Sequence, residues 1–329
     1  MNDNIQIDIL LATYNGEKYL KCQLDSILNQ THKNIRLLIN DDCSTDNTRA
    51  ILKEYEEKDD RIKVKYNEKN LGYVKNFEDL LKRVENKYFA LSDQDDFWKE
   101  EKIEKSLNKL LEEDADLVFT DLEPVDEKLN TITPSMVRFM QMDKNIKKHQ
   151  DYKSVFLRNC VTGCTILSKK ELINEYIPIP TKEPMVHDWW MALIISQIGK
   201  ITFLDEPTIK YRQHGNNQLG IYGMKNYIQD FDEYREKYIQ LKLDQFNLYV
   251  ENEQFFKNKE LITLSKNAIK YLEDIRVKRY FNFKNTRTFF ELYNMEIFSM
   301  RLKTYLMLNL PIVGRGLFNL RAVICKIKK

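Results

Sequence analysis

Three carboxylates stand within four positions of the stretch FALSDQDDFW (residues 89–98), at Asp93, Asp95 and Asp96. Carboxylates this close repel one another and are costly to bury. Their oxygens are the ligands that Mg²⁺ and Mn²⁺ prefer, and these ions complete their shells with water and substrate phosphates. The stretch therefore suggests a divalent-cation site with Asp95 as a ligand and Asp93 or Asp96 beside it. The spacing Asp-x-Asp also arises by chance, and no His/Cys cluster points to zinc.

Polar residues follow other apolar runs in the same way. The segments ATYNG (residues 12–16) and DDCSTD (residues 41–46) and the residue Asp121 each come directly after such a run. Ligands of an open parallel sheet bind at the carboxyl ends of its strands, so these residues predict one shared acidic crevice. Coincidental capping of turns and helices by aspartate is the alternative.

The elements that would position these residues alternate over the first 130 residues. Apolar runs predict strands at residues 5–13, 36–40, 62–66, 88–92 and 117–120. Helices are expected at residues 17–30, 77–84 and 99–113, and one that Ser44 or Thr45 caps should end near residue 58. This alternation predicts an α/β, Rossmann-like fold with a mostly parallel sheet flanked by helices.

The middle of the chain is less regular. Here we expect a loop or broken helix, one further helix and three short strands. The expected ranges are 133–151 for the loop, 188–199 for the helix, and 161–168, 201–204 and 208–211 for the strands.

The last third has a different character. Neither Gly nor Pro occurs from Met224 to Leu310, which predicts a helical extension, and we place the domain boundary between residues 1–220 and 221–329. From Lys266 onward there are fourteen Lys/Arg against four Asp/Glu. Residues 304–329 mix basic and apolar residues, which favours an amphipathic helix on an anionic membrane surface. Packing on the catalytic domain or on a second copy is the alternative.

Composition narrows the cellular setting. The net charge is +2, and the five cysteines (Cys22, Cys43, Cys160, Cys164 and Cys325) form no CxxC pair, which favours reduced thiols in the cytoplasm. We expect no signal peptide at the N-terminus and no membrane-spanning segment. No nucleic-acid partner is expected, and the sequence leaves the oligomeric state open.

Two common phosphate-binding loops are missing from the sequence. There is no GxxxxGK[ST] motif, and no GxGxxG follows the first predicted strand. A bound nucleotide would therefore need a metal ion and side chains to hold its phosphates.

Seven segments together carry a family resemblance over about residues 5–220. They are LLATYNGEKYLKCQLDSILNQT, LLINDDCSTDNT, NEKNLGYVKNFEDLL, ALSDQDDFW, VTGC, HDWW and YRQHGNN. In this order and spacing they resemble a family-2 inverting glycosyltransferase of the GT-A fold, similar to bacterial rhamnosyltransferases of surface-polysaccharide synthesis. HDWW and RQHGNN favour the rhamnosyltransferases.

The resemblance implies a role for individual residues of the nucleotide site. Ala12, Thr13 and Tyr14 would line the base pocket, and Asp42, possibly with Asp41, would accept a hydrogen bond from the pyrimidine N3–H. Asp93 would contact the ribose or the sugar. The remaining nucleotide or sugar contacts would come from Asn70, Gly72, Lys75 and Asn76.

The resemblance also implies a metal site and a catalytic base. Asp95 would bind the metal and, through it, the diphosphate, with Asp96 as a further ligand or a turn residue; exchange of their roles is the alternative. His214 would lie near the metal in a loop over the diphosphate, unless this loop is a plain turn. Asp188 would be the base.

Chemistry supports Asp188 independently. An acceptor hydroxyl must lose its proton as it attacks the donor sugar, and direct attack inverts the anomeric carbon with one base and no enzyme nucleophile. Asp188 could instead only cap the helix after it, and His187 is a rival base. Trp189 and Trp190 could stack on a sugar, or pack in the core. Gly163 could shape the acceptor side or admit a neighbouring backbone.

The resulting hypothesis is transfer of L-rhamnose from dTDP-β-L-rhamnose, with Mg²⁺ or Mn²⁺, to a saccharide or lipid-linked saccharide. UDP-glucose, UDP-galactose and UDP-N-acetylglucosamine are alternative donors. A nucleotidyltransferase and a non-enzymatic receiver-like module that binds Mg²⁺ are more distant alternatives. The lipid-linked acceptor implies a cytoplasmic enzyme at the inner membrane surface.

Overall fold

A computed structural model describes residues 4–142, 146, 151–215, 230–278, 283–295, 298–310 and 313–316. The chain forms two compact units. The first comprises residues 1–181 and 186–220, and the second comprises residues 182–185 and 221–329. Each unit is described by itself.

The first unit is built on a mixed sheet with the strand order β3-β2-β1-β4-β7-β6-β8-β5. Its strands are β1 (Ile7–Thr13), β2 (Ile35–Asp41), β3 (Ile62–Tyr66), β4 (Tyr88–Ser92), β5 (Phe97–Trp98), β6 (Leu117–Val125), β7 (Leu167–Lys169) and β8 (Ile201–Arg212). The pairs β1–β2, β2–β3, β1–β4 and β6–β8 are parallel. The pairs β4–β7, β6–β7 and β5–β8 are antiparallel. The predicted α/β fold is therefore confirmed, with a sheet that is more mixed than expected.

The strand directions bring the candidate residues to one edge. Thr13 pairs with Asp41, and Leu11 pairs with Ser92, so β1, β2 and β4 end side by side. Because β6 and β8 run in the same direction as β4, their carboxyl ends lie at that edge too. The loops after these strands are where an open sheet binds ligands.

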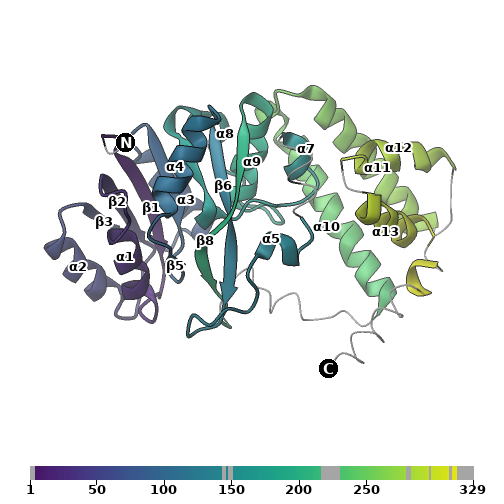
Figure 1. Ribbon diagram of the computed structural model, residues 1–329. Helices are drawn as coiled ribbons and strands as arrows, with labels where there is room; N and C mark the ends of the chain where they lie inside the picture. The colour runs from purple at the N-terminus through teal and green to yellow at the C-terminus, as the bar shows by residue number, and fades with distance from the viewer. Residues whose placement is uncertain are drawn as a thin grey trace. The chain divides into compact units, whose positions relative to one another are not determined.

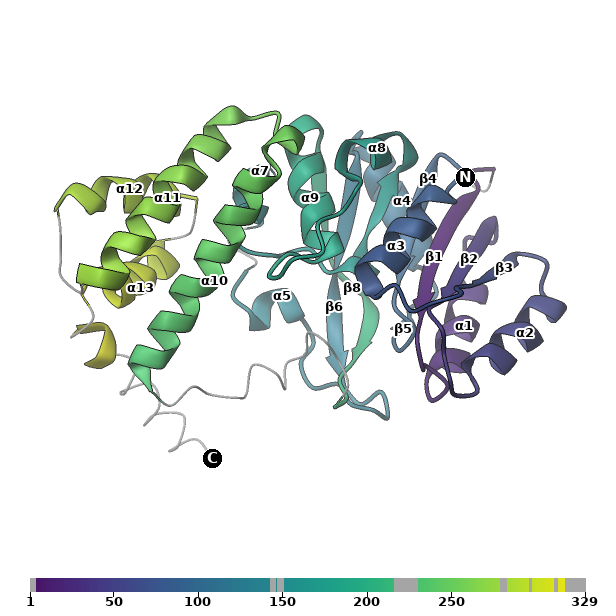
Figure 2. The same ribbon diagram turned by 180° about the vertical axis from the view of Figure 1, so that it is seen from behind.

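Helices cover both faces of this sheet. They are α1 (Leu20–Leu28), α2 (Thr48–Lys58), α3 (Tyr73–Lys82), α4 (Lys102–Glu112), α5 (Met136–Phe139), α7 (Tyr152–Val155), α8 (Ile173–Tyr176) and α9 (His187–Ile198). Figures 1 and 2 show α3 on one face and α1 and α4 on the opposite face. Short 3₁₀ helices span Gly163–Thr165 and Lys170–Leu172.

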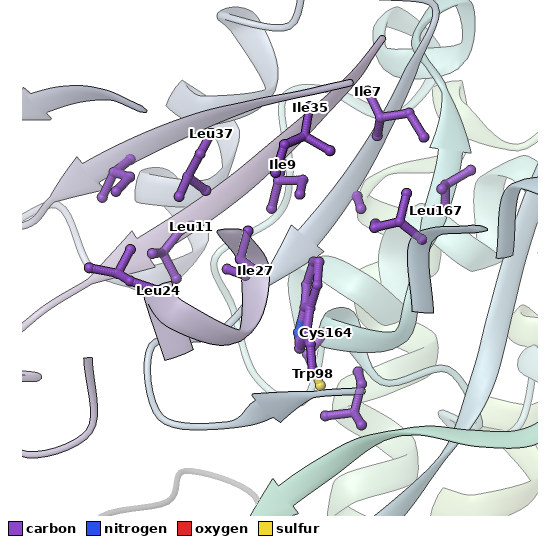
Figure 3. Close-up of a cluster of buried hydrophobic side chains, with 14 of the residues drawn as sticks. Ile7, Ile9, Leu11, Leu24, Ile27, Ile35, Leu37, Trp98, Cys164 and Leu167 are labelled. Carbon is purple, nitrogen blue, oxygen red and sulfur yellow. The ribbon is translucent and has the colours of Figure 1, made fainter. Parts of the chain in front are cut away.

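The core of the first unit follows from the sequence of its strands. β1 reads IDILLAT, and its aliphatic side chains are fully buried on both faces of the sheet. On one face, Ile7, Ile9 and Leu11 belong to a core cluster with Leu24 and Ile27 of α1 and with Trp98, as Figure 3 shows. Strands covered on both faces have this continuous apolar character.

Four local expectations of the sequence are wrong. Residues 161–168 form the 3₁₀ helix Gly163–Thr165 and the start of β7 instead of one strand. Residues 201–212 form one strand, β8, instead of two. Neither Ser44 nor Thr45 caps α2, because this helix begins at Thr48, whose amide N–H donates to Asp46.

Asp121 is the fourth correction. It lies inside β6, not at its end, and is fully buried. Its carboxylate accepts hydrogen bonds from the Ser135 hydroxyl and the Val137 N–H at the start of α5. The residue therefore anchors a short helix to the sheet and does not belong to the acidic crevice.

The second unit is helical, as predicted from its lack of Gly and Pro. Its described helices are α10 (Phe231–Glu251), α11 (Lys259–Lys278), α12 (Phe283–Tyr293) and α13 (Phe298–Asn309), with a 3₁₀ helix at Glu253–Phe255. Buried aromatic residues such as Phe246, Tyr271 and Phe289 pack between them. Most of the predicted amphipathic segment 304–329 lies outside the described residues, and so do residues 143–145 and 147–150 of the predicted loop. In the described part of the chain, no helix is long and apolar enough to cross a membrane.

Candidate active site

The carboxyl ends of β1 and β2 hold the first group of predicted residues. Asp41 is fully buried, and its carboxylate accepts hydrogen bonds from the Arg49 guanidinium (2.7 Å) and the Ser44 N–H (3.1 Å). The Thr13 hydroxyl lies 3.4 Å from the other carboxylate oxygen. Asp41 is thus satisfied by the protein itself.

Asp42 ties the loop before α3 to the end of β2. Its carboxylate accepts hydrogen bonds from the N–H groups of Leu71 (2.8 Å) and Gly72 (2.9 Å) and from the Asn67 side chain (2.9 Å). The Asn70 side chain donates to the carbonyl of Asp42 at 3.0 Å. Gly72 has φ +75°, a left-handed backbone that suits glycine, so its residue type fits this turn.

The structure gives Lys75 and Asn76 protein partners as well. Asn76 is buried and bridges the Asn67 side chain and the carbonyl of Asn40. The ammonium of Lys75 pairs with Glu78 at 2.8 Å. Asn76 therefore holds the frame of the site, while Asn70 is exposed and Lys75 partly exposed.

Gln94 is a site residue that the sequence reasoning missed. Its side-chain amide accepts from the Tyr14 N–H (2.9 Å) and donates to the Tyr14 carbonyl (3.0 Å), so it joins the loop after β1 to the loop after β4. A Cβ added to Gly16 would lie 2.3 Å from Oε1 of Gln94, so a larger residue there would displace the Gln94 side chain. The Tyr14 side chain itself is 49% exposed, and Ala12 is half-buried. Tyr14 is free to stack on a flat ring.

Asp93 and Asp96 lie together after β4. One oxygen of each and the sulfur of Cys164 are all within 4.8 Å of one another. Asp96 is fully buried, accepts from the Arg212 N–H through Oδ1, and its Oδ2 has no hydrogen-bond partner among the described residues. Burial and then the charge of Asp95 raise the pKa of both carboxyls, and Asp188 adds to the effect on Asp93.

Asp95 has a different environment. It is partly exposed, and its Oδ2 hydrogen-bonds Nε2 of His214 at 2.7 Å. The imidazole of His214 stacks on Tyr19 with ring centroids 5.1 Å apart, and the Arg212 guanidinium lies 4.5 Å from the same ring. The structure thus brings the predicted pair Asp95 and His214 together.

These residues fit a divalent cation. Asp95 and His214 are close enough to be neighbouring ligands of one ion, and Asp96 carries a buried oxygen without a partner. The carboxylate oxygens suit Mn²⁺ or Mg²⁺. The accessible position of Asp95 favours it as the direct ligand, whereas Asp96 lies behind it in the interior.

A buried lysine lies beneath this acidic group. Lys102 of α4 is fully buried, with its ammonium 3.9 Å from the centre of the Trp98 ring. Burial lowers the pKa of Lys102 to about 7, and the charges of Cys164 and Asp96 oppose that shift. Sequence periodicity gave no sign of this residue, because lysine is rarely found fully buried.

Asp188 is held in one orientation by three donors. Its Oδ2 accepts from the Gly163 N–H (2.7 Å), and its Oδ1 accepts from the Asn159 side chain (3.1 Å) and the Trp189 N–H (2.5 Å). Burial, opposed by the bonds from Gly163 and Trp189, raises the pKa of Asp188 to about 6. Asp188 is the second residue of α9 and not its N-cap, which is Val186. Asn159 was not predicted.

The sequence left alternatives open for the neighbours of Asp188. Trp189 and Trp190 are both buried and donate their indole N–H to the carbonyls of Val155 and Tyr176, so neither can stack on a sugar. Burial lowers the pKa of His187 to about 3, which makes it a much weaker base than Asp188.

Comparisons with known proteins bear on this arrangement. A model of the family described as Glycosyl transferase family 2 matches residues 8–175. An uncharacterized glycosyltransferase of Haemophilus influenzae is 30% identical over 66% of this chain and 68% of its own length. A dTDP-rhamnosyl transferase of Shigella flexneri is 31% identical over 64% and 73%. An Escherichia coli enzyme named as a UDP-Glc:α-D-GlcNAc-diphosphoundecaprenol β-1,3-glucosyltransferase is 29% identical over 64% and 78%.

Solved structures share the fold. Staphylococcus aureus TarS 1-349 in complex with UDP is 16% identical, with a TM-score of 0.52 over 84% of this chain and 93% of that one. A mannosyltransferase from Pyrobaculum calidifontis, in complex with GDP-Man and Mn²⁺, is 12% identical, with a TM-score of 0.52 over 95% and 86%. At these identities the likeness concerns the fold.

Proposed function

Because this chain belongs to glycosyl transferase family 2, we propose that it moves a sugar from a nucleotide-activated donor to a saccharide acceptor with inversion at the anomeric carbon. The proposal places the donor at the carboxyl ends of β1, β2 and β4 and the acceptor beside Asp188. The residues around these two positions suggest a role for each side chain.

One observation carries the proposal. Asp188 is a carboxylate that three donors hold in place, and it interacts electrostatically with Asp93 of the acidic group after β4. A base and an acidic, cation-compatible group therefore stand within one site. Transfer from a nucleotide diphosphate sugar needs both.

The reaction would use Asp188 as general base. Its carboxylate takes the proton of the acceptor hydroxyl while that oxygen forms a bond to C1 of the donor sugar and the bond from C1 to the diphosphate oxygen breaks. The pKa near 6 keeps Asp188 ionised at neutral pH and still basic enough to accept a proton. The hydrogen bond from Gly163 fixes the direction of the acceptor oxygen's approach.

A divalent cation, when bound, stabilises the charge of the departing diphosphate as a Lewis acid. Asp95 would hold it, with His214 at its side and Asp96 as a further ligand. The P. calidifontis mannosyltransferase, solved in complex with GDP-Man and Mn²⁺, supports a divalent cation as cofactor. The buried Asp41 and Asp42 would position the loops around the pyrimidine ring of the donor nucleotide. The exposed Tyr14 would stack on that ring.

For the donor we propose dTDP-β-L-rhamnose. The HDWW and RQHGNN segments and the S. flexneri dTDP-rhamnosyl transferase support it. The E. coli relative, whose name includes UDP-Glc, makes UDP-glucose the main competitor. That name also supports a lipid-linked diphosphate saccharide as acceptor, in polysaccharide synthesis.

We also propose that the enzyme works on the cytoplasmic face of the membrane as a peripheral protein. The fourteen Lys/Arg after residue 265 are suited to anionic headgroups, and a lipid-linked acceptor would lie there. Cosedimentation of the full chain with phosphatidylglycerol-containing vesicles at low and high salt tests this part. Failure to bind at low salt would contradict it.

A donor panel tests the central proposal. The Mn²⁺-loaded protein is incubated with dTDP-rhamnose, UDP-glucose, UDP-galactose or UDP-N-acetylglucosamine, and release of the nucleotide diphosphate is followed. We expect turnover with dTDP-rhamnose and a requirement for metal. If isothermal titration shows no metal-dependent binding of any nucleotide in the panel, the glycosyltransferase mechanism proposed here is wrong.

A further inference from the structure

A buried histidine beside the candidate base has two unmet ring nitrogens. His187 is 8% exposed and directly precedes Asp188 in α9. Neither Nδ1 nor Nε2 finds a hydrogen-bond partner within the part of the chain that the structure describes. Buried polar groups are bonded in the great majority of cases, and an unmet one is costly. Such a side chain beside a base therefore points to a missing ligand.

The ring of His187 is held by aromatic contacts. It stacks on Phe77 with the ring centroids 4.1 Å apart and meets Tyr73 edge-on at 6.1 Å. Both aromatic residues belong to α3, whose first residue follows Gly72, and Gly72 in turn is bound by Asp42. The helix that begins at the candidate nucleotide loop thus also orients the imidazole.

Gly163 brings this ring and the candidate base together. A Cβ added at Gly163 would lie 3.0 Å from Nε2 of His187 and 3.4 Å from Oδ2 of Asp188. Both polar atoms therefore approach the same side of one residue. A side chain at position 163 would press against the imidazole, which would have to shift by a few tenths of an ångström, so glycine suits this close approach.

We propose that His187 hydrogen-bonds a sugar hydroxyl next to the carboxylate of Asp188 and thereby determines which saccharide is accepted. This inference rests on the proposed function. The bound group would be the hydroxyl neighbouring the reacting centre, on either the donor sugar or the acceptor sugar. The two sources share one chemistry and are separated by experiment.

The protonation state of the ring selects a hydroxyl over an anion. Burial lowers the pKa of His187 to about 3, so the imidazole is neutral at pH 7 and offers one donor and one acceptor. A hydroxyl both donates and accepts, which matches it. A phosphate or carboxylate would be better bound by an imidazolium, which this apolar setting of Phe77 and Tyr73 disfavours.

Titration calorimetry on the Mn²⁺-loaded full chain tests the inference. Wild type, His187→Phe and His187→Gln are each titrated with dTDP and with dTDP-rhamnose, or with UDP and UDP-glucose if the panel selects that donor. The KM for an alkyl-diphosphate-linked N-acetylglucosamine acceptor is measured in parallel. Phe keeps the ring and its stacking but removes both nitrogens, and Gln returns one donor.

We expect His187→Phe to leave the affinity for the nucleotide diphosphate unchanged within about twofold. It should weaken binding of the nucleotide sugar about tenfold if the donor supplies the hydroxyl, or raise the acceptor KM about tenfold if the acceptor does. His187→Gln should fall between Phe and wild type. The Tm of His187→Phe should rise by a few degrees, because an apolar ring needs no partner there.

His32 offers a matched control. It is also buried, but its Nε2 hydrogen-bonds the carbonyl of Ile5 at 2.8 Å, before the start of β1. His32→Phe should lower the Tm and leave both sugar measurements unchanged. If His187→Phe binds and transfers sugar like wild type, a buried water satisfies the ring and the inference is wrong. If wild type itself binds no nucleotide sugar, the proposed function fails and this inference falls with it.

Discussion

Two groups of aspartates lie at the same edge of the sheet, and their surroundings are opposite in character. Asp41 and Asp42 at the carboxyl end of β2 are buried among hydrogen-bond donors, which include an arginine and backbone N–H groups. Asp93 and Asp96 after β4 are crowded by other carboxylates, and one buried oxygen of Asp96 has no partner among the described residues.

The carboxylates of Asp41 and Asp42 already have their hydrogen-bond partners within the protein, whereas those of Asp93 and Asp96 lack full compensation from the residues that the structure describes. Charge-assisted bonds of the first kind stabilise a loop conformation without any ligand. Buried carboxylates that repel one another are instead tolerated where a cation or a substrate compensates them. We therefore infer that the loop after β2 has its final conformation without a ligand, whereas the carboxylates after β4 are stabilised only when metal and substrate bind.

We expect the largest effect, a loss of transfer rate, from a substitution of the candidate general base Asp188. Asp188→Asn keeps an oxygen that can accept the Gly163 N–H but cannot take a proton. We expect the transfer rate to fall about 10³-fold while metal-dependent nucleotide affinity stays within about twofold. Single-turnover transfer and calorimetry measure the two quantities. Substantial remaining turnover would remove Asp188 from the base role.

The same base predicts a pH dependence. Since burial raises the pKa of Asp188 to about 6, kcat/KM should fall tenfold per pH unit below that value and level off above it. The profile is measured on the wild type with saturating Mn²⁺ between pH 4.5 and 8.5. A level profile down to pH 5 would contradict the assignment.

The next effect concerns the metal. Asp95→Ala removes the accessible oxygen beside His214 and should weaken Mn²⁺-dependent binding of dTDP about 100-fold. Asp60→Ala, a change at an exposed carboxylate on the surface, is the control and should have no effect. If Asp96→Ala abolishes metal dependence while Asp95→Ala does not, the two roles are exchanged.

A smaller effect is expected on the β2 side. Asp42→Ala leaves the Leu71 N–H without its acceptor and the Gly72 N–H with only the Asn70 side chain, which should lower the free energy of unfolding by about 1–3 kcal/mol. Urea denaturation without ligand or metal measures this. An unchanged midpoint would show that the loop does not depend on Asp42 and would weaken the contrast between the two groups.

The sequence predicted the parts that follow from periodicity and strand direction. Polar residues directly after apolar runs placed Asp41, Asp42 and Asp95 at one edge, because parallel strands end together. Asp121 failed this rule, since its strand continues for four more residues with a buried aspartate inside it. The two tryptophans of α9 could have been recognised as core residues, because that helix is apolar on nearly every face.

Contacts between distant segments could not be predicted. Gln94 meets Tyr14 across eighty positions, and Asn159 reaches Asp188 from a loop without periodicity. Lys102 lies on the apolar face of α4, where a lysine reads as an interruption of the pattern and not as a buried group. Such residues are identified only when the chain is folded.

The smallest effect that we predict is a change in the free energy of unfolding whose sign differs between the two groups of aspartates. In the fold, burial and the charges of Asp95 and Asp188 raise the pKa of Asp93 to about 7, so the folded protein holds more protons than the unfolded chain between about pH 4 and pH 7. Stability from this group is therefore present at low pH and is lost as the pH rises through the folded pKa. Asp93→Asn should remove this loss and raise the free energy of unfolding at pH 8 by about 1 kcal/mol relative to wild type.

Metal-free urea denaturation of wild type and Asp93→Asn at pH 5, 6, 7 and 8 measures the difference, in which contributions from groups that do not interact with Asp93 cancel. Asp60→Asn, at the exposed carboxylate, should run parallel to wild type. Added Mn²⁺ should stabilise wild type more at pH 8 than at pH 5, because the ion competes with protons for the carboxylates around Asp95. If Asp93→Asn is instead less stable than wild type at pH 8, as Asp42→Ala is expected to be, then the carboxylate of Asp93 is satisfied by its neighbours and the two groups of aspartates do not differ in kind.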